Sequence, residues 1–110
     1  MRPADISRSE VSTVIVVVGV LEIRLALRES RSLKDKRHIL QSLKDRLRHD
    51  FNVSVAEVDG QELLQSGTLA VAQVSSDSRY VRGSLEKVLQ VVRRCRDAQL
   101  TDYDIEILHQ

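Results

Sequence analysis

The spacing of apolar residues alternates along this chain between two and about 3.6, and this alternation constrains the fold more than any other feature. A spacing of two predicts a strand with one buried face, whereas a spacing near 3.6 predicts an amphipathic helix. In chain order, the pattern predicts a strand, a helix, two strands, a second helix and a last strand. The length of 110 residues suits one domain.

Residues 13–27 form the first predicted strand. They are rich in β-branched residues up to Gly19, and apolar and charged residues alternate after it. A strand that is apolar first on both faces and then on one is typical of the centre of a sheet. Further strands are predicted at residues 52–58, 68–75 and 99–108.

Residues 33–49 and 79–96 are the predicted helices, because their apolar side chains gather on one side of a helical wheel. Short polar residues precede both segments and favour helix starts there. The expected N-cap residues are Ser32, with Asp35 in a capping-box position, and either Asp77 or Ser78.

This order predicts an α+β fold, a ferredoxin-like β-α-β-β-α-β sandwich. It has a four-stranded antiparallel sheet with two helices on one face, and the other face has no cover within a monomer. Residues 1–12 are polar and mixed in charge, so we expect a disordered or loosely attached N-terminal tail there. Residues 13–110 are expected to form a single ferredoxin-like domain.

The sequence favours a cytoplasmic protein with no membrane partner. The single cysteine, Cys95, cannot form an internal disulfide, so nothing requires an oxidising compartment. The longest apolar run, Val14–Leu21, is shorter than the roughly 20 residues that span a bilayer. Asp5 and Glu10 precede this run, which fits a signal peptide poorly.

The nearly balanced net charge of +1 conceals a separation of charge. The two predicted helices hold twelve basic and three acidic side chains, whereas the rest of the chain holds five basic and thirteen acidic ones. If both helices lie on one face of the sheet, that layer is strongly basic. A basic layer could follow a phosphate backbone, or it could serve solubility alone.

Four basic residues of the first helix fall within about 80° of the helical wheel, beside the apolar stripe. Together with two arginines at the end of the second helix, they are the predicted nucleic-acid-binding residues. These six are Lys34, Arg37, Lys44, Arg48, Arg93 and Arg94.

Lys36 lies near the centre of the apolar stripe of the first helix. We expect its long side chain to reach past the edge of the sheet into solvent. The alternatives are an ion pair, with Glu57 as a possible partner, or a contact to a ligand.

No set of residues predicts catalysis, a metal site or a cofactor, so we expect a protein that is not an enzyme. Cys95 lies in an apolar stripe and is expected to be a buried structural thiol. His38 and His49 are expected to be solvated. The acidic residues at positions 57, 59 and 62 lack the regular spacing of a cation-binding loop.

The uncovered face of the sheet is expected to carry aliphatic residues such as Val18, Val20, Ala70 and Ala72. Sheets of this topology that read single-stranded RNA stack bases on aromatic residues, and the first and third strands have none. An uncovered aliphatic face is typical of an interaction surface, so we expect a homodimer formed through it.

Several segments resemble the YlxP-like family of small uncharacterised bacterial proteins across about residues 14–108. The resemblance lies in Ser32-Leu33-Lys34-Asp35-Lys36-Arg37, the segment 51–58 (Phe-Asn-Val-Ser-Val-Ala-Glu-Val), Val74-Ser75-Ser76-Asp77 and Leu85-Glu86-Lys87-Val88-Leu89. It implies a ferredoxin-like fold and no established activity. It also implies a genomic context of translation and ribosome maturation. The chain departs from the family pattern around residues 59–65, and relatives often have a tryptophan at the position of Leu64.

The resulting hypothesis is a non-catalytic accessory protein that binds structured RNA or a ribosomal particle through its basic helix layer. The alternative is a homodimeric protein-interaction or small-ligand-binding module that uses the open aliphatic sheet face.

Overall fold

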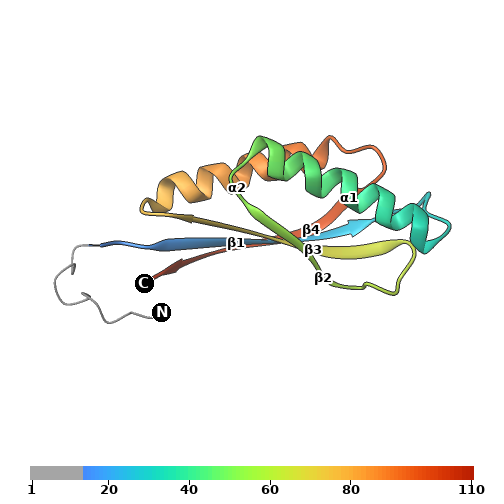
Figure 1. Cartoon of the computed structure of the whole chain (residues 1–110), viewed down its shortest axis with the longest axis horizontal. Helices are drawn as coiled ribbons and strands as arrows, with labels where there is room; N and C mark the ends of the chain where they lie inside the picture. Colours follow the sequence, from blue (N-terminus) through green and yellow to red (C-terminus); the bar gives the residue numbers. More distant parts are fainter. Residues whose placement is uncertain (1–13) are drawn as a thin grey trace, which may run out of the picture.

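The computed structural model describes residues 14–110 and confirms the predicted order of elements (Figure 1). The predicted tail at residues 1–12 lies outside the described residues. The elements are β1 (Val17–Ala26), α1 (Leu33–Asp50), β2 (Ser54–Asp59), β3 (Ser66–Ser75), α2 (Ser78–Arg93) and β4 (Gln99–His109).

The four strands form one antiparallel sheet in the order β2-β3-β1-β4, so β1 is central as predicted. Both helices cover the same face of this sheet (Figure 1). The alternate residues of β1 that point toward the helices are buried and include Leu21 and Ile23, both fully inaccessible. They pack with Leu69 of β3 and Leu85 of α2 into one core. This arrangement is the α+β ferredoxin-like fold that the sequence predicted.

Both helices begin after predicted N-cap residues, Ser32 and Asp77, although α2 begins at Ser78, one residue earlier than predicted. The Ser32 hydroxyl accepts a hydrogen bond from the Asp35 amide at 3.0 Å, and the Asp77 carboxylate accepts from the amides of Arg79 and Tyr80. Each bond satisfies an amide that has no partner within its helix. The Asp35 carboxylate accepts from the Arg31 amide at 3.0 Å, one residue earlier than in a standard capping box.

The second helix is shorter than predicted at its end, since α2 stops at Arg93 rather than at residue 96. The amides of Arg94 and Cys95 donate to the carbonyl oxygens of Val91 and Val92, three residues back, and this tighter turn closes the helix. Cys95 therefore lies beyond the end of the helix, where it packs against the core and is half-buried. The expectation of a buried thiol was wrong for this reason.

Gly19 allows α2 to approach the centre of β1. A Cβ atom at this position would overlap Val81 and lie 2.8 Å from Leu85 Cδ1. Both of these side chains are fully buried on α2. The missing side chain at Gly19 therefore sets how closely the helix layer packs on the sheet.

Candidate nucleic-acid interface

The two helices carry most of the basic residues of the described chain. Both helices lie on one side of the sheet (Figure 1). α1 packs over β2, and α2 packs over β1, β3 and β4. Among the lysines and arginines of this layer within residues 14–110, only Lys36, Arg46 and Arg48 have an acidic partner at ion-pair distance. The rest have none among residues 14–110, so the layer keeps most of its positive charge.

The six predicted nucleic-acid-binding residues all belong to the helix layer, but they occupy four different parts of it. Helical spacing places Arg37 and Lys44 with Arg48 on the flank of α1 above β2. Lys34 lies at the start of α1, where it lines a hollow together with His38 and Asp97. Arg94 lies in the groove between the helices, and Arg93 lies on the flank of α2 beside β4.

Arg48 joins the flank of α1 to β2. Its Nη2 donates a hydrogen bond of 2.8 Å to the Val55 carbonyl oxygen in β2, and its Nη1 lies 3.6 Å from Asp45 Oδ1. The helical spacing places Lys44 on the same flank, where it is half-buried. The guanidinium group of Arg48 is thus partly engaged in contacts within the protein. Lys34, at the opposite end of α1, is exposed and has no ion pair within residues 14–110.

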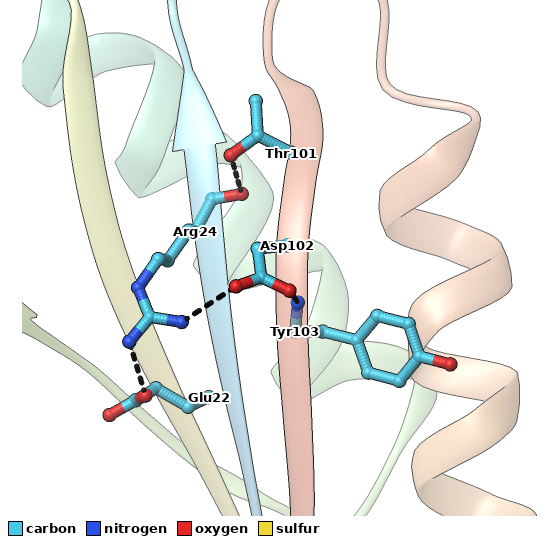
Figure 2. A network of polar contacts seen from close by, with 5 residues as sticks. All are labelled: Glu22, Arg24, Thr101, Asp102 and Tyr103. Atoms are coloured by element: carbon cyan, nitrogen blue, oxygen red, sulfur yellow. Dashed lines mark hydrogen bonds and ion pairs between the residues drawn. The ribbon is translucent and has the colours of Figure 1, made fainter.

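Arg93 extends in the opposite direction, away from α1. Its guanidinium carbon lies 5.6 Å from the centre of the Tyr103 ring on β4, within the range of a cation–π contact. Figure 2 shows Tyr103 reaching from β4 toward the neighbouring helix. The contact joins α2 to the edge strand β4. Tyr103 itself is 44% exposed.

A groove of about 290 Å³ runs between α1 and the end of α2. Its floor is apolar and its walls are basic, with guanidinium groups from both sides. The lining residues are His38, Ile39, Ser42, Leu43 and Arg46 from α1 with Val91, Arg94, Cys95, Arg96 and Asp97 from the other wall.

Most polar residues of this groove were missed by the sequence analysis. His38, Ser42 and Arg46 recur every four residues, so they form a polar row on the flank of α1 opposite to Lys44 and Arg48. The four-residue spacing of these side chains could be seen in the sequence. The groove could not be predicted from it, because the spacing does not indicate which flank of α1 faces the other helix.

Lys36 is buried, and its expected extension into solvent was wrong. Its side chain is 2% exposed, and Nζ lies 2.9 Å from Glu57 Oε2. Nζ also donates hydrogen bonds to the carbonyl oxygens of Gly60 (2.6 Å) and Leu63 (2.7 Å). Three oxygens surround the three donors of the ammonium group, so the alternative of an ion pair with Glu57 is the correct one.

Gly67 makes room for this ion pair. A Cβ atom there would lie 3.3 Å from Glu57 Oε2 and 3.4 Å from Lys36 Cε. The ammonium group ties the turn between β2 and β3 to the start of α1. Leu63 and Leu64 project from this anchored turn and are 49% and 41% exposed.

The face of the sheet away from the helices is aliphatic along its middle, as predicted. Val18 and Val20 alternate with the buried residues of β1, and the register pairs Val20 with Ala72 of β3. Val74 and Leu108 extend this aliphatic surface and are 64% and 46% exposed.

The β4 side of this open face is acidic, in line with the excess of acidic residues that the sequence places outside the two helices. The register places Asp104 opposite Glu22 and Glu106 opposite Val20. Arg24 bridges the acids, with 3.1 Å to Glu22 Oε1 and 3.2 Å to Asp102 Oδ2 (Figure 2). The two sides of the sheet therefore differ in the sign of their charge.

A bulge in β4 supports this network. The register shifts between Arg24 and Leu25, and Thr101 is the additional residue. Its hydroxyl donates to the Arg24 carbonyl oxygen at 3.1 Å, and the Asp102 carboxylate accepts from the Tyr103 amide at 2.9 Å (Figure 2).

Residues 14–110 contain no group of three or more side chains placed to hold a metal ion. Over the same residues, neither helix is long and apolar enough to cross a membrane. His38 and His49 are exposed as expected.

Fold and surface define a small ferredoxin-like α+β protein with a basic helix layer and an open sheet face. The chain belongs to the DUF503 family of proteins of unknown function, whose model matches residues 18–105. It is 30% identical over 76 residues to the uncharacterized protein YlxP of Bacillus subtilis (strain 168), a match that covers 69% of this chain and 83% of that protein. The resemblance seen in the sequence is thereby confirmed.

Several solved structures are similar to this chain at low sequence identity. The de novo designed protein Foldit4 has a TM-score of 0.44 at 15% identity, covering 86% of this chain and 96% of its own. A C-terminal segment of the alpha subunit of aIF2 from Pyrococcus abyssi has a TM-score of 0.47 at 12% identity, covering 86% of this chain and 51% of its own. These similarities carry no argument about function.

Proposed function

We propose that this protein is a non-catalytic, cytosolic RNA-binding accessory protein whose helix layer contacts the phosphate backbone of structured RNA, such as that of a ribosomal particle. The observation that carries the proposal is the charge of the helix layer. Basic side chains of both helices are exposed there, and most have no acidic partner within residues 14–110. Phosphate contacts of this kind give affinity without reading sequence.

The charge of the helix layer predicts how strongly the affinity for RNA depends on salt concentration. Each phosphate contact releases counterions, so the logarithm of the binding constant falls with the logarithm of salt concentration by about 0.9 per contact on a duplex. About four contacts would lower the affinity roughly a hundredfold when salt rises fourfold.

The test is binding of a fluorescent RNA hairpin at several salt concentrations, together with sedimentation with ribosomal subunits at low and high salt. In the double variant Lys34→Gln, Arg37→Gln, the salt slope should fall by about 1 to 2. The matched control is Arg24→Gln, Arg28→Gln, which removes the same charge away from the helix layer. No binding of the unmodified protein at low salt, or equal losses in both variants, would contradict the proposal.

A homodimer formed through the open sheet face is the second candidate, supported by the exposed aliphatic residues there. The acidic side of that face restricts how two copies could stack. A two-fold axis parallel to the strands places β4 of one copy over β2 of the other, where Ser54 and Ala56 are uncharged. An axis across the strands would instead place acidic β4 on acidic β4.

Light scattering at about 100 µM protein tests the homodimer. The variant Ala72→Glu adds a charge to the aliphatic middle of the face and should dissociate a dimer formed there. A monomeric unmodified protein at this concentration would remove the second candidate.

A further inference from the structure

The groove between α1 and the end of α2 combines a defined hollow with unneutralised cations. Arg94 and Arg96 line it from one side, and neither has an ion pair among the described residues. Arg46 lines it from the other side and has only a distant acid, with Nε 3.8 Å from Asp50 Oδ2. Cations therefore approach the same hollow from two segments that are far apart in the sequence.

Two features oppose an anion in this groove, and both are weaker than the arginines. Asp97 contributes one carboxylate to the lining. The end of α2 directs the negative end of its helix dipole toward the groove, equivalent to about half a unit charge. Three guanidinium groups, one of them partly offset by Asp50, exceed these contributions, so the net field in the groove favours an anion.

The size and lining indicate what kind of anion fits. The volume of about 290 Å³ is at the lower limit for small-molecule pockets. Its lining has no phenylalanine, tyrosine or tryptophan, and the imidazole of His38 is the one ring there, so the groove is poorly suited to stacking a base. Guanidinium groups donate paired hydrogen bonds to phosphate oxygens, and the Ser42 hydroxyl adds another donor.

We propose that this groove binds one phosphate group of the RNA backbone, held by Arg94 and Arg96 with Arg46 and Ser42 on the opposite wall. The inference rests on the proposed function and deepens it. It makes the groove the point where the RNA is positioned, and it leaves Lys34 and Arg37 as outer contacts. The same chemistry would accept free phosphate, so the experiment separates the two sources.

The first measurement compares two double variants of the full chain in the RNA-hairpin assay. Arg94→Gln, Arg96→Gln removes two charges from the groove, and Arg79→Gln, Arg82→Gln removes two exposed charges from the other end of α2. Thermal unfolding, monitored by circular dichroism, shows whether each variant remains folded. We expect the groove variant to lose affinity at least tenfold and the control threefold or less. Equal losses would overturn the assignment of the groove.

The second measurement is an NMR titration of the unmodified protein with inorganic phosphate, using sodium chloride at matched ionic strength as the reference. Saturable shifts of the amides of Ser42, Arg94 and Arg96, absent with chloride, would support a phosphate site. If those shifts occur and the RNA hairpin does not bind, the proposed function fails and the groove is a site for free phosphate. If the hairpin binds but the groove amides do not shift, the groove assignment fails and the proposed function remains.

Discussion

The ammonium group of Lys36 lies 2.9 Å from Glu57 Oε2, inside the protein rather than at its surface. The lysine comes from the first turn of α1 and the glutamate from β2, so the ion pair joins the helix layer to an edge strand. Two backbone carbonyl oxygens of the turn between β2 and β3 complete the set of acceptors. A buried charge with this many partners is compensated, and removing either member leaves the other without compensation.

Replacing Lys36 alone should therefore be costly. In Lys36→Met, the Glu57 carboxylate and two carbonyl oxygens lose their partner, and we expect the free energy of unfolding to fall by about 3–5 kcal/mol. Urea unfolding followed by circular dichroism measures this change. The double variant Lys36→Met, Glu57→Leu should recover part of the loss, because it leaves no unpaired charge. A loss below about 1 kcal/mol in the single variant would mean that the ion pair contributes no more than an exposed one.

Gly19→Ala should destabilise the protein although it adds only one methyl group. The added Cβ would overlap Val81 and crowd Leu85, both of which are fully buried. Overpacking of this kind costs about 1–3 kcal/mol. Thermal unfolding detects it as a lower Tm, and an unchanged Tm would show that α2 can move away from the sheet without cost.

Gly83→Ala should have the opposite effect. Gly83 lies within α2, and a Cβ atom there would meet nothing within 4 Å. Alanine favours a helix over glycine by up to about 1 kcal/mol, so the free energy of unfolding should rise by that amount. Urea unfolding of this variant beside Gly19→Ala compares the same chemical change at a crowded and an open position. A decrease in stability would contradict the open surroundings of Gly83.

Ser32→Ala should weaken the start of α1. The Ser32 hydroxyl accepts from the Asp35 amide at 3.0 Å, and losing an N-cap costs about 1 kcal/mol. Ser32→Asp supplies another acceptor and should retain most of the stability. Urea unfolding of both variants checks the assignment. Equal destabilisation by alanine and aspartate would show that the hydroxyl does not act as a cap.

Local periodicity was enough to predict the fold. Each element carries its own pattern, and the order of patterns admits few topologies once the helices must cover one face. The position of Gly19 within the first strand was visible, but its contact with Val81 was not, because the two residues meet only after α2 packs. The end of α2 was also predicted too late in the chain. The apolar spacing continues to Cys95, but the backbone leaves the α-helix after Arg93 through a tighter turn.

The site was less predictable because it depends on which elements lie side by side. The sequence placed Lys36 on the apolar stripe of its helix but could not show the carbonyl groups of Gly60 and Leu63 that receive it. In the same way, it grouped Arg93 with Arg94. The structure separates them, with Arg93 against Tyr103 and Arg94 in the groove between the helices. Adjacent residues on a helix point in directions about 100° apart.

The opposite charges on the two sides of the sheet have a kinetic consequence. Basic groups of α1 and α2 lie on one side, and Asp102, Asp104 and Glu106 lie on the other. Such a molecule has a dipole moment across its sheet, and the field of a polyanion rotates it during approach before any contact forms. Productive collisions with a nucleic acid would then arrive helices first, and the acidic strand would stay turned outward, where a further molecule could reach it.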